Sequence, residues 1–528
     1  MNIERPISFG NEKGNNMLAN IKSHGLSGIN GFSVQVQVDI SKGLPSYETV
    51  GLPDAAVREG RERVRAAIKN SGFAFPVDRI VVNLAPAGRK KEGAVYDLPI
   101  AVGLMAASGQ IPSHPTESIL FLGELALDGR VRPITGVLPM VIDAHSKGCH
   151  MVAVPAENGP EASYIEGVTV LPVESLRQLV AHLRGEQAIA PCAIRRWDPA
   201  GITYSVDFSE IRGQQGAKRA AEIAVAGSHN MLLIGTPGSG KTMLARSIPS
   251  ILPELTFEEA LEITKIHSAA GVMRESKRGI ISERPFRAPY HGASAAALVG
   301  GGAKAAPGEI SLAHCGVLFL DEFPEFHKDV LEALRQPLED GVVHITRAAA
   351  SASYPAQFML VAAMNPCPCG YYGSRITPCR CKPYEIHRYQ NRISGPLLDR
   401  TDLFVEMSEV GYSDLTGKAA SGEASSVIRA RVEQAREMQR QRYNKEGIWC
   451  NAQLNNKLVR KYCALNAAGE RLLGQAFASL KLSARAYGRI LKVARTIADL
   501  AGEEMIAEAH IAEAIQYRRL DGAYWGEE

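Results

Sequence analysis

The sequence predicts an α/β protein in which an N-terminal α/β domain precedes a central domain built on a parallel sheet and a C-terminal helical region. The chain of 528 residues is too long for one hydrophobic core, which favours about three domains. Apolar, strand-like runs separated by long segments with helical stretches are typical of a doubly wound parallel sheet. A glycine-rich loop directly after the first of these runs predicts a phosphate site on that sheet.

The N-terminal elements follow from local patterns. After a polar, aperiodic tail at residues 1–16, the run VQVQVDI beginning at Val34 alternates like a half-buried strand. The segment Ala55–Asn70 has helical spacing. We therefore expect a mixed α/β domain over residues 17–187 and a proline-containing linker over residues 188–204.

Three strand-like runs define the central domain, which we place at residues 205–416. They are Met231–Ile234, Val317–Leu320 and Phe358–Ala363. A linker rich in Gly, Ala and Ser, over residues 417–427, separates this domain from a helical region over residues 428–528.

Composition excludes several classes of protein. Hydrophobic residues make up 45% of the chain and charged residues 22%, as in ordinary globular proteins rather than disordered ones. The net charge of +3 is small, so binding of a nucleic acid would need a local basic surface. No apolar run approaches the roughly 20 residues of a membrane span, and the N-terminus lacks the apolar core of a signal peptide. We expect a cytoplasmic protein with no membrane partner.

The strongest motif is GTPGSGKT, which fits the P-loop pattern and directly follows the apolar run MLLI. Glycines let the backbone N–H groups of such a loop curl around phosphate oxygens, so the sequence predicts binding of ATP and Mg²⁺. The predicted nucleotide-binding residues are Gly235, Thr236, Pro237, Gly238, Ser239, Gly240, Lys241 and Thr242. Lys241 would reach the β and γ phosphates, and the Thr242 hydroxyl would ligate Mg²⁺.

Two further strand ends supply catalytic candidates. The run Val317–Leu320 ends in Asp321 and Glu322, which we interpret as a Walker B pair: Asp321 would hold Mg²⁺, and Glu322 would orient the attacking water. The third run leads into Asn365, whose amide would help to place that water. A solvated acidic turn and an Asn that caps a turn are the corresponding structural alternatives.

These motifs, with RISGPLLDRTDL (392–403) and LSARAYGRILKVARTIADL (482–500), resemble the ComM/YifB group of AAA+ proteins, relatives of the magnesium-chelatase ATPase subunit. The resemblance covers nearly all of the chain from Met17. It implies that Arg400 is an arginine finger acting across a subunit interface, with Asp399 beside it, and that Arg485 of the lid contacts the γ phosphate. It also implies a homo-hexameric ring that drives DNA branch migration during natural transformation.

The N-terminal domain resembles the protease domain of Lon (an S5 domain 2-like fold) and the matching domain of the DNA-repair protein RadA. The stretches KKEGAVYDLPIA and GELALDGRVRPITGVLPM carry this likeness. Val95 aligns with the serine nucleophile and Leu138 with the lysine base. Neither residue can perform that chemistry, so we expect a scaffold or DNA-engaging domain without proteolytic activity.

Two segments of the central domain are candidates for DNA contact. The glycine-rich segment ERPFRAPYHGASAAALVGGGAKAAPGEI resembles the family's helix-2 insert, and residues 342–357 lie where the family has a pre-sensor hairpin. In related ring motors, cationic side chains on such segments follow a phosphate backbone. The candidate residues are Arg284, Arg287, His291, Lys304, His344 and Arg347, with a weaker candidate loop at Arg89, Lys90 and Lys91. Packing between domains or subunits is the alternative role for both segments, and a solvated basic surface is the alternative for the loop.

The chain has nine cysteines, and four of them lie close together in the loop CPCGYYGSRITPCRC. Cys367, Cys369, Cys379 and Cys381 could hold a tetrahedral structural Zn²⁺. The C-x-C spacing departs from the commoner C-x-x-C pattern, so four reduced free thiols remain the alternative.

The sequence leaves two other functions open beside a DNA helicase or translocase. One is an ATPase that remodels a protein partner, as in magnesium chelatase, although the chelatase ATPase subunit lacks the Lon-like domain. The other is an ATP-dependent protease, which Val95 and Leu138 oppose.

Overall fold

The computed structural model describes residues 18–198, 204, 206–273, 279–302, 305–346, 351–409, 422–480 and 482–525. The tail at residues 1–16 and the first half of the predicted linker over residues 417–427 lie outside these ranges. The chain forms two compact units. The first unit comprises the residues up to Trp197 with His267–Ile280, and the second comprises Asp198–Ile266 with the chain from Ile281 onward.

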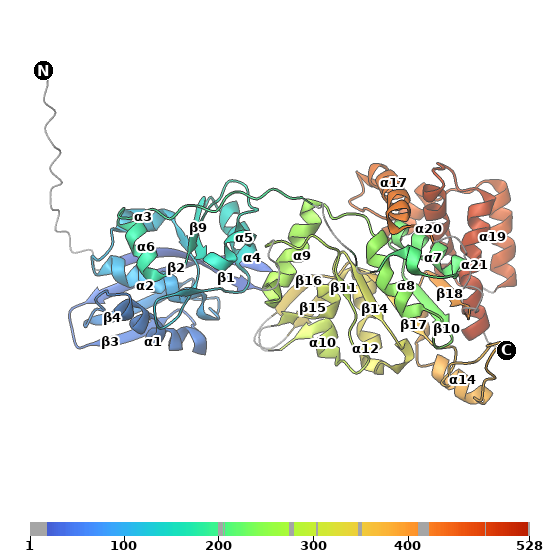
Figure 1. Cartoon of the computed structure of the whole chain (residues 1–528), viewed down its shortest axis with the longest axis horizontal. Helices are drawn as coiled ribbons and strands as arrows, with labels where there is room; N and C mark the ends of the chain where they lie inside the picture. Colours follow the sequence, from blue (N-terminus) through green and yellow to red (C-terminus); the bar gives the residue numbers. More distant parts are fainter. Residues whose placement is uncertain are drawn as a thin grey trace, which may run out of the picture. The chain divides into compact units, whose positions relative to one another are not determined.

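The first unit is built on a seven-stranded mixed sheet in the order β3-β4-β2-β1-β5-β8-β9 (Figure 1). Its strands are β1 (Leu18–Ser27), β2 (Asn30–Ser41), β3 (Ser46–Val50), β4 (Arg79–Ala85), β5 (Leu120–Phe121), β8 (Met151–Pro155) and β9 (Thr169–Val173). β1 and β2 form an antiparallel hairpin, and β2 also pairs antiparallel with β4. The predicted alternation in β2 is present, since its valines are buried and its glutamines are not.

Helices cover this sheet, and a small pair of strands, β6 (Glu124–Leu125) and β7 (Val131–Arg132), completes the unit. The helices are α1 (Ala55–Asn70), α2 (Asp97–Ala107), α3 (Ser113–Ser118), α4 (Val137–Ser146), α5 (Gly159–Ala162) and α6 (Leu176–Leu183). α1 has the predicted bounds and begins after Asp54, whose side chain accepts a hydrogen bond from the Val57 N–H at 2.8 Å. Every residue of α2 is buried, which explains its apolar sequence after Asp97, a carboxylate that pairs with Arg63 at 2.7 Å.

The second unit contains a five-stranded parallel sheet in the order β11-β14-β17-β10-β18. Its strands are β11 (Phe286–Arg287), β14 (Val317–Leu320), β17 (Met359–Met364), β10 (Met231–Gly235) and β18 (Leu403–Met407). The three predicted strands correspond to β10, β14 and β17, which lie side by side in the order β14-β17-β10 (Figure 1). Their carboxyl ends therefore meet at one edge, which brings the predicted site residues together.

Around this sheet lie two short strand pairs, β12 (Gly300–Gly301) with β13 (Ala306–Pro307) and β15 (Val342–Thr346) with β16 (Ser351–Pro355). The surrounding helices are α7 (Gln215–Gly227), α8 (Lys241–Ser247), α9 (Phe257–Ala270), α10 (Ala295–Val299), α11 (Glu309–Leu312), α12 (Lys328–Ala333), α13 (Arg335–Asp340), α14 (Pro383–Gln390) and α15 (Gly395–Leu398). The pair β15–β16 is the predicted hairpin.

The C-terminal region is helical, as predicted. Its helices are α17 (Ser425–Tyr443), α18 (Asn456–Tyr462), α19 (Ala467–Ser479), α20 (Ala484–Leu500) and α21 (Glu508–Trp525). α17 begins at Ser425, within the segment that the sequence predicts as a linker. Ser425 is buried, and its hydroxyl accepts a hydrogen bond from the Phe208 N–H at 2.8 Å, so the first residue of this helix belongs to the core. Among the described helices, none combines the length and apolar character that crossing a membrane requires.

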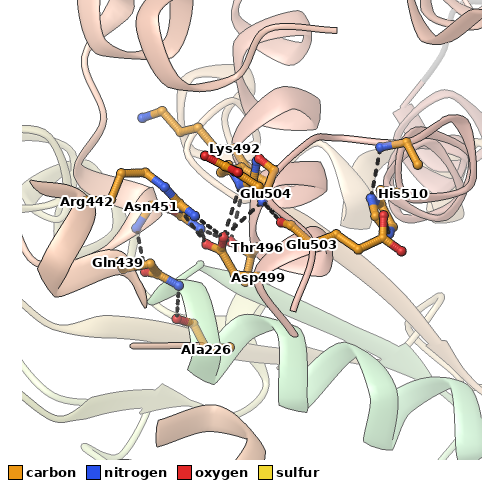
Figure 2. Close-up of polar contacts among 12 residues, drawn as sticks. Ala226, Gln439, Arg442, Asn451, Lys492, Thr496, Asp499, Glu503, Glu504 and His510 are labelled. Carbon is orange, nitrogen blue, oxygen red and sulfur yellow. Dashed lines mark hydrogen bonds and ion pairs between the residues drawn. The ribbon is translucent and has the colours of Figure 1, made fainter. Parts of the chain in front are cut away.

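A buried polar network ties α17 to α20 and to α7 (Figure 2). The Asp499 carboxylate of α20 accepts hydrogen bonds from Arg442 at 2.6 and 3.1 Å and from Asn451 at 2.8 Å. Gln439 of α17 donates to the Ala226 carbonyl of α7 at 3.1 Å. α7 leads into β10, so the C-terminal helices α17–α21, which we call the lid, share one packed core with the P-loop strand.

Candidate nucleotide site

The predicted P-loop connects β10 to α8, and its backbone requires glycine at two positions. Gly238 and Gly240 have φ values of +79° and +92°, a region that other residues adopt only with strain. Gly235 has a different role, because a Cβ there would lie 2.7 Å from the Met407 carbonyl oxygen of β18. The loop therefore needs glycine both to turn and to pack against the neighbouring strand.

Lys241 begins α8 and joins the P-loop to the end of β17. Its Nζ donates to the carbonyl oxygens of Gly235 at 2.7 Å and Thr236 at 2.9 Å, and to Oδ1 of Asn365 at 3.1 Å. Burial lowers the pKa of Lys241 to about 8, although the Asp321 carboxylate partly opposes this shift. Asn365 thus lies beside the P-loop lysine, at the strand end where the sequence places it.

The two predicted Mg²⁺ ligands contact each other directly. The Thr242 hydroxyl donates to Oδ2 of Asp321 at 2.8 Å, which links α8 to the end of β14. Hydroxyl and carboxylate oxygens are hard ligands that suit Mg²⁺, and the ion would be shared with nucleotide phosphates. This pair therefore fits a magnesium site of the P-loop kind.

Glu322 stands beside a histidine. It has a φ of +53°, and its Oε2 lies 3.0 Å from Nδ1 of His291. The His291 ring packs against the Tyr290 ring at 4.0 Å between centroids. His291 follows β11, the strand next to β14 in the sheet. The sequence suggests a DNA-contact role for His291, and no local pattern could have paired it with Glu322.

A cavity of about 500 Å³ opens over the P-loop. It is lined by Glu210, Ile211, Arg212, Gln214, Thr236, Pro237, Gly238, Ser239, Gly240, Met243, Tyr371, Ile376, Thr377 and Glu409. This volume suits a mononucleotide, with phosphates on the loop and the flat face of the base against Ile211 and Met243. Sequence reasoning missed the residues before α7, which carry no motif, and it assigned the cysteine loop a metal site but not a place in the wall of this cavity.

Arg400 lies just after α15 and is held within its own chain. Its Nη1 donates to the Pro396 carbonyl at 2.8 Å, and its Nη2 forms an ion pair with Glu339. These contacts engage both terminal nitrogens of the guanidinium.

Arg485 is the most exposed of three arginines along α20. Its side chain is 66% exposed, and its Nη1 lies 3.0 Å from Oδ2 of Asp399. Arg489 pairs with buried Asp402, and Arg495 is itself buried and donates to Asp499. Both of those arginines pair with buried carboxylates, so Arg485 is the one of the three whose side chain is mostly exposed.

The predicted DNA-contact residues lie in different surroundings. Arg284 pairs with Glu259 at 2.8 Å, and Arg287 pairs with Glu309 at 2.6 Å. Both guanidinium groups therefore form ion pairs within the second unit, and a phosphate would have to compete with these carboxylates. Lys304 and Arg347 lie outside the described residues. His344 of β15 is exposed and lies 3.2 Å from the Ser353 hydroxyl across the hairpin.

The N-terminal candidates also need adjustment. Lys91 is buried, and its Nζ donates to the Pro86 carbonyl, so it is unavailable to a phosphate. Lys90 pairs with Glu92 at 2.8 Å. The positions aligned with the Lon catalytic pair, Val95 and Leu138, are both buried apolar core residues.

The four cysteines of the loop between β17 and α14 lie within reach of a single ion. The Sγ atoms of Cys367, Cys369 and Cys379 are separated by 3.4, 3.6 and 3.7 Å, and all four Sγ atoms lie within 4.8 Å of one another. Cys381 is the fourth member. None of the described cysteines forms a disulfide.

The sheet order and the P-loop site define a P-loop protein of the AAA+ class. Comparison with protein families adds three matches: "Subunit ChlI of Mg-chelatase" over residues 36–158, "Magnesium chelatase, subunit ChlI" over 207–415, and its C-terminal family over 422–518. The N-terminal region is also similar to Lon protease 2 of Bacillus subtilis, at 26% identity over 145 residues covering 26% of each chain.

Two relatives align along nearly the whole chain. YifB of Salmonella typhimurium is 44% identical over 96% of this chain and 97% of its own length. Competence protein ComM of Haemophilus influenzae is 44% identical over 95% of this chain and 98% of its own. The chain therefore belongs to the ComM/YifB family of magnesium chelatase-like AAA+ ATPases.

Proposed function

We propose that this protein is a hexameric, ATP-driven DNA motor that acts as a helicase or branch-migration translocase on recombination intermediates. The observation that carries the ATPase part is the contact of Lys241 with Asn365 and of Thr242 with Asp321, directly after the P-loop residues that line the cavity. These contacts bring together the phosphate-binding, metal-binding and water-placing groups that phosphoryl transfer to water needs.

Within this proposal, Glu322 is the residue that orients and polarises the attacking water. Its carboxylate is 55% exposed and contacts His291, so it must turn from the histidine toward the γ phosphate before hydrolysis. Thr242 and Asp321 would hold Mg²⁺, which neutralises charge on the β and γ phosphates. Asn365 would share the placing of the water with Glu322.

The ring is part of the same proposal. Arg400 is bound by Glu339 and the Pro396 carbonyl, and its side chain is partly exposed, so exchange of these partners would free it for another subunit. Supplied to a neighbouring P-loop, it would stabilise charge on the transferred phosphoryl group. Hydrolysis would then require assembly, and Arg485 would complete the site from the lid.

The DNA part rests on the family and on the hairpin β15–β16. The relative from H. influenzae is named competence protein ComM. The hairpin exposes His344, so it could reach a phosphate backbone in a central pore, and Arg347 stays a candidate from the sequence alone. Arg284 and Arg287 are not carried into this proposal, because their ion pairs occupy them. We place the motor in the cytoplasm, where DNA and reduced thiols occur together.

A second candidate is an ATPase that remodels a protein partner, as in magnesium chelatase. Matches to the chelatase subunit families along most of the chain favour this alternative. A Lon-like protease is disfavoured, because buried Val95 and Leu138 provide neither a nucleophile nor a base.

Steady-state ATPase rates with and without single-stranded and forked DNA, at matched low salt, test the proposal. We expect DNA to stimulate the ATPase rate of the wild type, and we expect no turnover in Lys241→Ala.

Glu322→Gln should still bind ATP but lose about 10²–10⁴-fold in turnover, the usual range for a group that assists proton transfer. Glu325→Gln is the matched control, since Glu325 is an exposed neighbour paired with Arg392.

Each outcome distinguishes the candidates. DNA-indifferent hydrolysis would move the assignment to a chelatase-like remodelling role, and a copurified protein partner would support it. Unchanged turnover in Glu322→Gln would remove that residue from its assigned role.

A further inference from the structure

The cysteine loop has the dimensions of a tetrahedral metal site. A zinc ion bound to four thiolates at about 2.3 Å places neighbouring sulfurs about 3.8 Å apart. The Sγ separations among Cys367, Cys369 and Cys379 are 3.4–3.7 Å, close to that value. A disulfide would need about 2.05 Å. The arrangement therefore fits thiolates that share one ion better than cysteines arranged for oxidation.

The backbone of the loop also suits thiolates. The Tyr372 N–H donates to Sγ of Cys367 at 3.3 Å, and the Cys381 N–H donates to Sγ of Cys379 at 3.4 Å. Such donors lower the cost of gathering negative sulfurs around a cation and orient them toward it. Four protein ligands leave no open coordination position, so the ion would be structural rather than catalytic.

The residues between the two cysteine pairs form one wall of the nucleotide cavity. Tyr371, Ile376 and Thr377 line that cavity together with the P-loop. Gly370, with a φ of +87°, packs so closely on Pro237 that a Cβ would lie 2.7 Å from the proline ring. The cysteine loop and the phosphate loop are thus in direct contact.

We propose that Cys367, Cys369, Cys379 and Cys381 bind one Zn²⁺, and that this ion holds the loop as a wall of the nucleotide cavity. Nucleotide affinity then depends on zinc. The effect of zinc on nucleotide affinity rests on the proposed nucleotide site, whereas the binding of zinc by the four cysteines does not. The ion cross-links a segment that begins two residues after Asn365, so it restricts the wall to the conformation that contacts Pro237.

Metal analysis of the full-length protein, purified under reducing conditions, tests the binding of zinc. We expect about one zinc ion per chain. Cys369→Ser should lose this zinc, whereas Cys149→Ser, a cysteine of the first unit outside the cluster, should keep it. A zinc content near zero in the wild type would overturn the proposal, and so would full zinc content in Cys369→Ser.

Binding of a fluorescent ATP analogue in constant Mg²⁺ tests the effect of zinc on nucleotide affinity. Removal of zinc from the wild type with a zinc-selective chelator should weaken binding about tenfold or more, and added Zn²⁺ should restore it. This arm needs no substitution, so misfolding of a variant cannot imitate the result. Unchanged affinity after zinc removal would overturn the link.

The Gly370→Ala variant tests the role of the cavity wall independently of zinc binding. The added methyl group clashes with Pro237 and opposes the positive φ, while all four cysteines remain. We expect full zinc content with weakened nucleotide binding, and normal binding in this variant would contradict the role of the wall. In the wild type, one zinc ion per chain and zinc-dependent nucleotide binding without any ATPase activity would count against the proposed function alone.

Discussion

Lys241 donates to three protein oxygens at the place where the P-loop pattern puts a nucleotide phosphate. Thr242 similarly donates to Asp321, and Glu322 contacts His291. Each of these side chains has a protein partner that a phosphate, a metal ion or a water molecule must replace. Binding of ATP is therefore an exchange of polar partners, which avoids leaving a buried charge without one.

The lowered pKa of Lys241 predicts proton uptake on binding. Burial lowers this pKa to about 8, so a fraction of the ammonium groups is neutral above that pH. Nucleotide phosphates favour the charged form and raise the pKa, so binding at pH about 8.5 should take up a fraction of a proton, and affinity should fall as pH rises above about 8. Calorimetry in two buffers of different ionisation enthalpy measures this uptake.

The matched control for this prediction is Lys241→Arg, because a guanidinium stays charged across this range. Uptake at pH about 8.5 should disappear in this variant, and uptake in the wild type should be small near pH 7. Equal uptake in both proteins would assign the proton to another group.

At the scale of helices and strands, prediction succeeded where burial is uniform or strictly periodic, as in β2 and α1, and failed where a strand is very short or its apolar run is interrupted. β14 and β17 consist entirely of buried apolar residues, which a sequence displays as continuous runs. β11 has only two residues, and β18 carries the exposed Glu406 within its run, so neither was predicted as a strand. Contacts between distant segments, such as His291 with Glu322, depend on the sheet order and leave no periodic signal.

The polar network of the lid gives a prediction at this scale (Figure 2). Asp499 is buried and accepts hydrogen bonds from Arg442, Asn451 and Arg495. Asp499→Ala should cost about 3–5 kcal/mol, because it leaves two arginines without a counter-ion in the core. Unfolding in urea, followed by circular dichroism, measures the loss. Glu503→Ala on the exposed side should change stability by less than about 1 kcal/mol, and equal effects would contradict a structural role for the network.

On the scale of the whole molecule, the predicted catalytic groups fall into two sets. Lys241, Asp321, Glu322 and Asn365 lie at one edge of the parallel sheet, where β10, β14 and β17 end. Arg400 is held instead by Glu339 and Pro396 of its own chain. The sequence predicts the first set because strand ends of a parallel sheet converge. It predicts the role of Arg400 only through family resemblance, because an interface between subunits leaves no pattern within one chain.

Mixed rings test whether Arg400 acts on a neighbouring subunit. Arg400→Ala should bind nucleotide normally and lose about 10³-fold or more in turnover, the usual effect of removing an arginine finger. Mixed with Lys241→Ala chains, it should regain part of this activity, because some interfaces then pair an intact P-loop with an intact arginine. Arg440→Ala, which removes an exposed arginine paired along α17, should turn over normally. If no mixing ratio restores hydrolysis, Arg400 acts within its own chain, and the ATPase would not need a ring for catalysis.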